Sequence, residues 1–251
     1  MRRPSVAIIG LGLVGGSLAR ALTRKGYRVT GIDWPLVVRQ AQRTRAITRG
    51  ATRAEAAARS DVVVLAAPPA TNLRLLKRLA KVAPPGLILT DVSSVKRAIV
   101  GEATRLGLRG FVGGHPMAGT EKQGFSASRA DLFEGATWWL VPARSRRANR
   151  AVRALVRDAG ARPVITAAAR HDRVMAFLSH APQLVAWALL DAARADPVAR
   201  RQLRHAGPGF RGMTRLARSP RALWHDILAA NRVELARALS GLRRALERRT
   251  P

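Results

Sequence analysis

The sequence predicts an α/β fold, in which an N-terminal doubly wound parallel sheet is followed by an all-helical domain. Short β-branched and apolar runs alternate with segments of helical periodicity in the first two thirds of the chain. Such runs are nearly absent after residue 166. The length of 251 residues suits one large domain or two modest ones, and a 47% apolar content supplies a core. We therefore expect an α/β domain at 1–166 and a helical domain at 167–251.

Each predicted strand is a short, mostly apolar run, as expected for a buried strand. The first, at 5–10, is followed by a helix at 13–25 with Gly26 at its C-terminal end. Further strands are predicted at 27–33, 61–66, 87–91, 111–113 and 137–141, with one helix running through 73–80 after two prolines and another spanning 95–106.

The second domain is predicted to contain two long helices, at 168–193 and 222–249, with a glycine-rich break at 207–212. About 85 residues of mostly apolar helix bury little surface alone. We therefore expect this domain to pack against a second copy in a homodimer.

Composition excludes several classes of protein. The absence of cysteine excludes disulfide scaffolds, cysteine-ligated metal sites and thiol catalysis, and we expect no metal. The N-terminus lacks the cleavage site of a signal peptide, and no apolar run approaches the length of a membrane span. These features predict a cytoplasmic protein that does not bind membranes.

The formal charge of +30 is extreme, but 40 of the 45 basic residues are arginines scattered along the chain. No nucleic-acid-binding motif accompanies them. We therefore expect no nucleic-acid partner, although a nucleic-acid-binding protein with a vestigial nucleotide site remains an alternative. Attraction of an anionic substrate is a milder consequence of this charge.

A glycine fingerprint joins the first predicted strand to the first predicted helix. Its residues are Gly10, Leu11, Gly12, Leu13, Val14 and Gly15. Gly10 permits a tight turn, Gly12 allows a pyrophosphate to approach the backbone, and Gly15 lets helix and strand pack closely. Asp33 ends the next strand, where a carboxylate binds an adenosine ribose and repels a 2′-phosphate. The pattern predicts a Rossmann-type domain that binds NAD in preference to NADP.

Polar residues also follow two later strands, at the sheet edge where ligands of α/β folds bind. His115 lies between glycines and a proline, which predicts a rigid loop rather than an apolar face. A histidine there is suited to accept a proton while an alcohol is oxidised. Ser94 is placed to hydrogen-bond this histidine or the substrate hydroxyl. The alternative is a histidine with a purely structural hydrogen bond.

The helical half offers a third group of polar residues. His180 and Gln183 flank Pro182 in an otherwise apolar helix, and a proline-induced kink between them suggests a pocket wall. Arg211 lies in the glycine break and Arg215 after it, and either is suited to bind a carboxylate bidentately. In a chain with 40 arginines, the alternative is an ordinary surface charge.

These segments occur in the order GLGLVGGSLARAL, TDVSSVK, GGHPMAGTEKQG, LSHAPQ and GFRGMTRLA. In this order they resemble the prephenate/arogenate dehydrogenase family of tyrosine biosynthesis over nearly the whole chain. The resemblance implies a Rossmann domain, a helical dimerisation domain and an active site between them. It implies NAD-dependent oxidative decarboxylation of prephenate to 4-hydroxyphenylpyruvate, or of arogenate to tyrosine.

The resemblance also implies roles for individual residues. His115 would take the proton of the ring hydroxyl, and Ser94 would align that hydroxyl. Arg215 would hold a substrate carboxylate, while His180 and Thr120 would line the pocket.

The chain departs from the family pattern at two positions. Gln183 stands where many members have the second histidine of SHLPH, and Gly212 stands where they have the acidic residue of GFRD. Both departures concern the reading of the substrate side chain, and a glutamine can hydrogen-bond either the keto acid or the amino acid. We favour prephenate, with arogenate as the alternative. We expect no appended regulatory domain. A β-hydroxyacid or imine reductase, with Lys96 or Lys122 as the acid, is a remoter alternative.

Overall fold

The computed structural model describes residues 3–120 and 122–249, the side chains at 222 and 223 excepted. The chain forms two compact units, one ending at His171 and the other beginning at Asp172. The sequence predicted the boundary at 166.

The first unit is built on an eight-stranded sheet with the order β3-β2-β1-β4-β5-β6-β7-β8. Its strands are β1 Ser5–Ile9, β2 Arg28–Ile32, β3 Arg49–Ala51, β4 Val62–Leu65, β5 Ile88–Asp91, β6 Phe111–Pro116, β7 Thr137–Val141 and β8 Arg162–Ile165. β1 to β6 are parallel, whereas β7 pairs antiparallel to β6 and parallel to β8. The predicted doubly wound sheet is confirmed, and its last two strands run against the other six.

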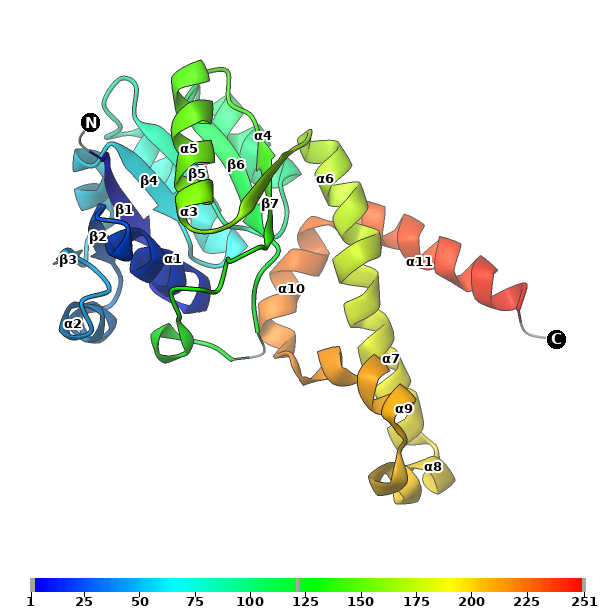
Figure 1. Cartoon of the computed structure of the whole chain (residues 1–251). Coiled ribbons are helices and arrows are strands. Elements are labelled where there is room, and N and C mark those ends of the chain that lie inside the picture. Colours follow the sequence, from blue (N-terminus) through cyan, green and yellow to red (C-terminus); the bar gives the residue numbers. More distant parts are fainter. Residues whose placement is uncertain (1–2, 121, 250–251) are drawn as a thin grey trace. The chain divides into compact units, whose positions relative to one another are not determined.

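Helices cover both faces of this sheet, as the ribbon shows for α5 on one of them (Figure 1). The helices are α1 Leu13–Arg24, α2 Pro35–Arg43, α3 Pro69–Ala80, α4 Arg97–Arg105 and α5 Arg146–Asp158. Successive side chains of a strand point to opposite faces. Accordingly, Val6 and Ile8 of β1 pack in one core cluster with α1 and α5, while Ala7 and Ile9 pack in another with α3 and α4.

A long helical stretch leads into the second unit, in agreement with the helix predicted over 168–193. It comprises α6 Ala168–Met175, a π-helical turn at Ala176–His180 and α7 Ala181–Ala195. Pro182 lacks the N–H that would continue the α-helical ladder, so a wider turn immediately before it accommodates the ring.

The remainder of the second unit consists of shorter helices. They are α8 Pro197–Gln202, a 3₁₀ turn Leu203–His205, α9 Pro208–Met213, a 3₁₀ turn Arg215–Arg218, α10 Arg221–Ala230 and α11 Arg232–Glu247. The glycine-rich segment predicted as a break begins the short helix α9 at Pro208. The prediction of a single helix over 222–249 is wrong, because the helix is interrupted at Asn231. The buried Asn231 Nδ2 donates to the backbone oxygen of Asp172 over 2.8 Å.

The stretch Ala168–Ala195 is long and apolar enough to cross a membrane by length and composition, with a mean hydropathy of 1.2 over its best window. Core helices of soluble proteins satisfy the same criterion. This one contributes Ala176 and Ala181 to the core of the second unit and carries three fully buried polar side chains, which are His171, His180 and Gln183.

Candidate active site

The glycine fingerprint lies between β1 and α1, and its three glycines meet different constraints. Gly10 has a φ of +98°, and a Cβ there would lie 2.7 Å from the carbonyl of Ala66. A Cβ on Gly15 would lie 1.9 Å from the oxygen of Gly10. At Gly12 no atom lies within 4 Å of the Cβ position. Gly10 and Gly15 are therefore required by packing, whereas Gly12 leaves open space at the N-terminus of α1, as a bound pyrophosphate needs.

Asp33 is anchored against the same loop. Its Oδ2 accepts a hydrogen bond from the backbone N–H of Leu11 over 2.6 Å, and its Oδ1 accepts one from that of Trp34 over 2.7 Å. Leu11 is buried, and Leu13 and Val14 pack against the core, so the apolar members of the fingerprint contribute packing and backbone. The residues fit a dinucleotide, because N–H groups at the helix start and a fixed carboxylate acceptor lie side by side.

His115 lies in strand β6, which corrects the prediction that it sits in a loop. Antiparallel pairing with β7 extends β6 to Pro116 and places His115 opposite Trp139. The side chain is buried, with 7% of its surface exposed. Its Nδ1 lies 2.9 Å from Nε2 of His171, on α6.

A buried ion pair holds the backbone that precedes His115. Lys96 Nζ donates to Asp91 Oδ2 over 2.5 Å and to the oxygen of Gly114 over 2.6 Å. Asp91 Oδ1 accepts from the N–H of Gly114 over 2.9 Å. The backbone pairing of β5 with β6 ends at Thr90 and Val112, so these side chains continue the connection where the ladder stops. Lys96 is fully buried and committed to this structural contact, which argues against its role as the acid of a reductase.

Ser94 follows β5 and is half-buried in the loop that leads to Lys96. Its neighbour Ser93 is buried, and the Ser93 Oγ accepts from Nδ2 of Asn72 over 2.9 Å. This bond joins the first turn of α3 to the loop after β5. Thr120 is exposed, and its Oγ1 accepts from the N–H of Lys122 over 3.2 Å.

In the second unit, Gln183 is joined to the segment that carries Arg215. The buried Gln183 Nε2 donates to the oxygen of Leu216 over 2.8 Å. Arg215 itself is exposed at the start of the 3₁₀ turn. His180 is fully buried, with its Nδ1 3.0 Å from Asn231 Nδ2.

Sequence reasoning missed His171 and gave Asp91 no role. His171 is 56 residues from His115 and sits in a helical stretch without a motif, so only the fold brings the two rings together. Asp91 ends the strand at 87–91, and its position at a strand end was the one available signal.

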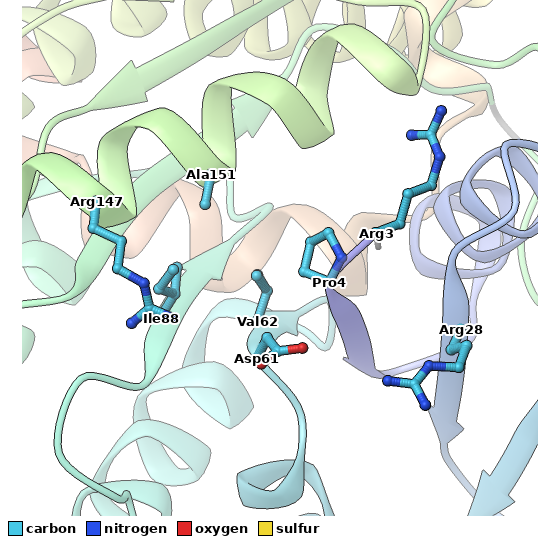
Figure 2. Close-up of a pocket in the computed structure, with 8 residues that line it drawn as sticks. All are labelled: Arg3, Pro4, Arg28, Asp61, Val62, Ile88, Arg147 and Ala151. Carbon is cyan, nitrogen blue, oxygen red and sulfur yellow. The ribbon is translucent and has the colours of Figure 1, made fainter. Parts of the chain in front are cut away.

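A hollow of about 460 Å³ lies at the opposite, amino edge of the sheet (Figure 2). It is lined by Arg3, Pro4, Arg28, Asp61, Val62, Ile88, Arg147 and Ala151. Asp61 accepts from the N–H and the hydroxyl of Ser5, and these bonds, with two nearby guanidiniums, hold the pKa of Asp61 below its usual range. Arg3 pairs with Asp158, and Arg147 donates to a loop carbonyl. These groups brace the strand starts, away from the carboxyl edge that carries His115.

Family models match most of the chain. The nucleotide-binding domain of prephenate dehydrogenase matches residues 18–165, and the dimerization domain of prephenate dehydrogenase matches residues 167–249. The glycine fingerprint precedes the first matched region.

Curated relatives include two prephenate dehydrogenases. That of Lactococcus lactis is 33% identical over 236 residues, covering 90% of this chain and 64% of its own length. That of Bacillus subtilis is 33% identical over 247 residues, covering 92% of this chain and 65% of its own length. The chain thus spans slightly less than two thirds of these relatives. A cyclohexadienyl dehydrogenase of Zymomonas mobilis is 31% identical, covering 90% of this chain and 80% of its own length.

Solved structures of prephenate and arogenate dehydrogenases are also similar to this chain. Prephenate dehydrogenase from A. aeolicus, in complex with hydroxyphenyl propionate and NAD+, has a TM-score of 0.91 and 31% identity, covering 99% of this chain and 90% of that one. Synechocystis arogenate dehydrogenase has a TM-score of 0.86 and 28% identity, covering 97% of this chain and 90% of that one. The chain belongs to the prephenate dehydrogenase family.

Proposed function

We propose that this protein is an NAD-dependent prephenate dehydrogenase that converts prephenate to 4-hydroxyphenylpyruvate with loss of CO2. The observation that carries the proposal is His115, which is buried at the carboxyl edge of the sheet and fixed there through its ring and its backbone. The family of the chain supplies the substrate class.

NAD is the cofactor in this proposal. The open space above Gly12 and the anchored carboxylate of Asp33 support it. The A. aeolicus relative was solved with NAD+. When bound, NAD+ would supply the acceptor for the hydride of the ring carbon that carries the hydroxyl. Asp33 contributes selectivity, because its negative charge repels the 2′-phosphate of NADP.

In this proposal, the side chains of the protein transfer one proton and bind the carboxylate of the substrate. His115 accepts the hydroxyl proton as the ring carbon gains carbonyl character. It returns that proton to the phenol oxygen when CO2 leaves, so the overall reaction neither releases nor consumes a proton. Ser94 aligns the hydroxyl, and Arg215 holds a carboxylate through its guanidinium. His180, Thr120 and Gln183 are proposed to contact the remainder of the substrate.

Arogenate is a second candidate substrate, and the orientation of the Gln183 side-chain amide favours it. Gln183 donates through Nε2 to Leu216, which leaves the acceptor Oε1 buried without a hydrogen-bond partner among the described residues. An ammonium group can donate to this oxygen, whereas the keto group of prephenate cannot.

We further propose a cytoplasmic homodimer. The family model for residues 167–249 is a dimerization domain. Large apolar side chains are exposed in the second unit, namely Phe177, Leu178, Val198, Met213, Val233 and Leu246. Light scattering should give twice the 27.1 kDa chain mass, and a monomeric mass would contradict the proposal.

The decisive experiment measures nicotinamide reduction with prephenate and arogenate, each with NAD+ and NADP+. Prephenate with NAD+ should give the highest kcat/KM. His115→Asn should lower kcat about 10²- to 10⁴-fold, as expected for loss of a general base. Arg215→Ala should instead act mainly on the KM for substrate. The exposed His225 provides a matched control, because His225→Asn should leave both constants unchanged. Folded protein that reduces neither cofactor with either substrate would refute the proposal.

A further inference from the structure

We propose that His171 is a positioning residue, which holds His115 in the one tautomer that can act as a base. The catalytic consequence rests on the proposed function, whereas the tautomer of His115 can be measured without any turnover.

The geometry of the two rings is that of a direct hydrogen bond. His115 Nδ1 and His171 Nε2 are 2.9 Å apart, and the rings meet edge to face with centroids 5.1 Å apart at 71°. His171 is fully buried and His115 nearly so. A separation of 2.9 Å between two ring nitrogens requires that one carry a proton and the other a lone pair.

The surroundings keep both rings in place. Trp139 stands opposite His115 in the β6–β7 ladder, and its ring meets that of His171 edge-on at 6.2 Å and 80°. The backbone N–H of His171 donates to Ala167 over 2.9 Å at the start of α6. The Asp91–Lys96 pair acts on the peptide of Gly114 and so fixes the backbone that carries His115 rather than its ring.

Only one arrangement of the proton leaves His115 able to act. If Nδ1 of His115 donates to His171, then Nε2 of His115 keeps its lone pair and can accept a proton. If His171 donates instead, the neutral His115 carries its proton on Nε2 and has no lone pair for the substrate. A base at His115 therefore requires His171 as the acceptor, with its own proton on Nδ1.

The same bond favours the proton transfer itself. When His115 gains the hydroxyl proton, its Nδ1–H remains donated to the neutral His171. Hydrogen bonds from a charged donor are stronger than those between neutral groups, so the bond strengthens as the positive charge forms. His171 cannot replace His115 as the base, because its Nε2 is occupied by this bond and its ring has no exposed surface.

Two substitutions of His171 distinguish the effect of its hydrogen-bond acceptor from the effect of its ring shape. His171→Phe keeps an aromatic ring beside Trp139 but removes the acceptor. His171→Gln places an amide oxygen near the position of Nε2 and retains an acceptor. The exposed His225, changed to Gln, is the matched control.

The first measurement is the nitrogen chemical shifts of the five histidines in the ¹⁵N-labelled holoenzyme with NAD+ and no substrate. His115 should be protonated on Nδ1 in the unmodified protein and in His171→Gln. In His171→Phe it should become a mixture of tautomers. An Nε2-protonated His115 in the unmodified protein would overturn the proposal even if neither variant folds.

The second measurement is steady-state turnover. His171→Phe should lower kcat about 10- to 100-fold, as for loss of a hydrogen bond to a charged group. The KM for NAD+ should stay unchanged, and His171→Gln should recover most of the loss. A folded His171→Phe with unaltered kcat would refute the positioning role. If His115 is protonated on Nδ1 but the protein turns over neither substrate, the proposed function is refuted, whereas the hydrogen bond from His115 to His171 still stands.

Discussion

Gly12 and Gly15 belong to one fingerprint, but packing requires Gly15, whereas Gly12 leaves space for a ligand. Alanine substitutions at the two positions test this difference. Gly15→Ala forces a methyl group into the carbonyl of Gly10 and should destabilise the fold by about 1–3 kcal/mol or more. Gly12→Ala meets no protein atom at a φ of −70° and should cost at most about 1 kcal/mol. Its methyl group occupies space proposed for the pyrophosphate, so the Kd for NAD+ should rise at least about tenfold.

Urea unfolding and calorimetric NAD+ titration of the two variants check this division. Equal losses of stability would show that Gly12 is also fixed by packing. Unchanged NAD+ binding in Gly12→Ala would place the pyrophosphate elsewhere.

At the scale of single residues, a short pattern predicted the place in the fold of some residues and not of others. The turn at Gly10, the helical position of Gly15 and the place of Asp33 after a strand were predictable because strand, turn and helix follow one another directly in the chain. His171 was not, because its meeting with His115 depends on the antiparallel β7 and on the path from β8 into α6. Neither feature has a local signal near His115.

At the scale of elements, the central strands and helices were predicted because their apolar periodicity is clear. β3 and β8 were missed because strands of three and four residues are too short to show a period. The apolar stripe of α5, formed by Ala148, Val152, Leu155 and Val156, is clear in the sequence and was overlooked. The helix predicted over 222–249 failed because its break at Asn231 depends on side-chain contacts with residues more than fifty positions away.

The Asp91–Lys96 pair is the element-scale link between β5, the start of α4 and β6, and its energetics can be tested by a double-mutant cycle. Lys96→Met leaves a buried carboxylate without its cation and should cost about 3–5 kcal/mol. Asp91→Asn combined with Lys96→Met removes both charges and keeps an acceptor for Gly114, so the double variant should be more stable than Lys96→Met alone.

Chemical unfolding of the single and double variants gives the coupling. Lys77, whose side chain is 58% exposed, is the control, and Lys77→Met should change stability by less than about 0.5 kcal/mol. Strictly additive losses would mean that the two charges do not stabilise each other.

At the scale of the whole molecule, the dominant electrostatic feature is charge imbalance. The chain has 45 basic and 15 acidic side chains, so 30 cations lack an acidic partner even if every acid pairs with one cation. Repulsion among the excess cations opposes the compact state. Salt should therefore stabilise this protein, whereas it would weaken a fold that depended on surface ion pairs.

Raising NaCl from about 0.01 M to about 0.15 M shortens the Debye length from about 30 Å to about 8 Å. Relief of only about 1 kcal/mol of repulsion raises the Tm by about 2–4 °C in a chain of this size. Thermal unfolding at the two salt concentrations should show at least this increase. Changing the exposed Arg146, Arg150 and Arg153 of α5 to Glu lowers the net charge and should reduce the salt dependence. A Tm that falls as salt is added would show that ion pairs outweigh repulsion, despite the excess of 30 positive charges.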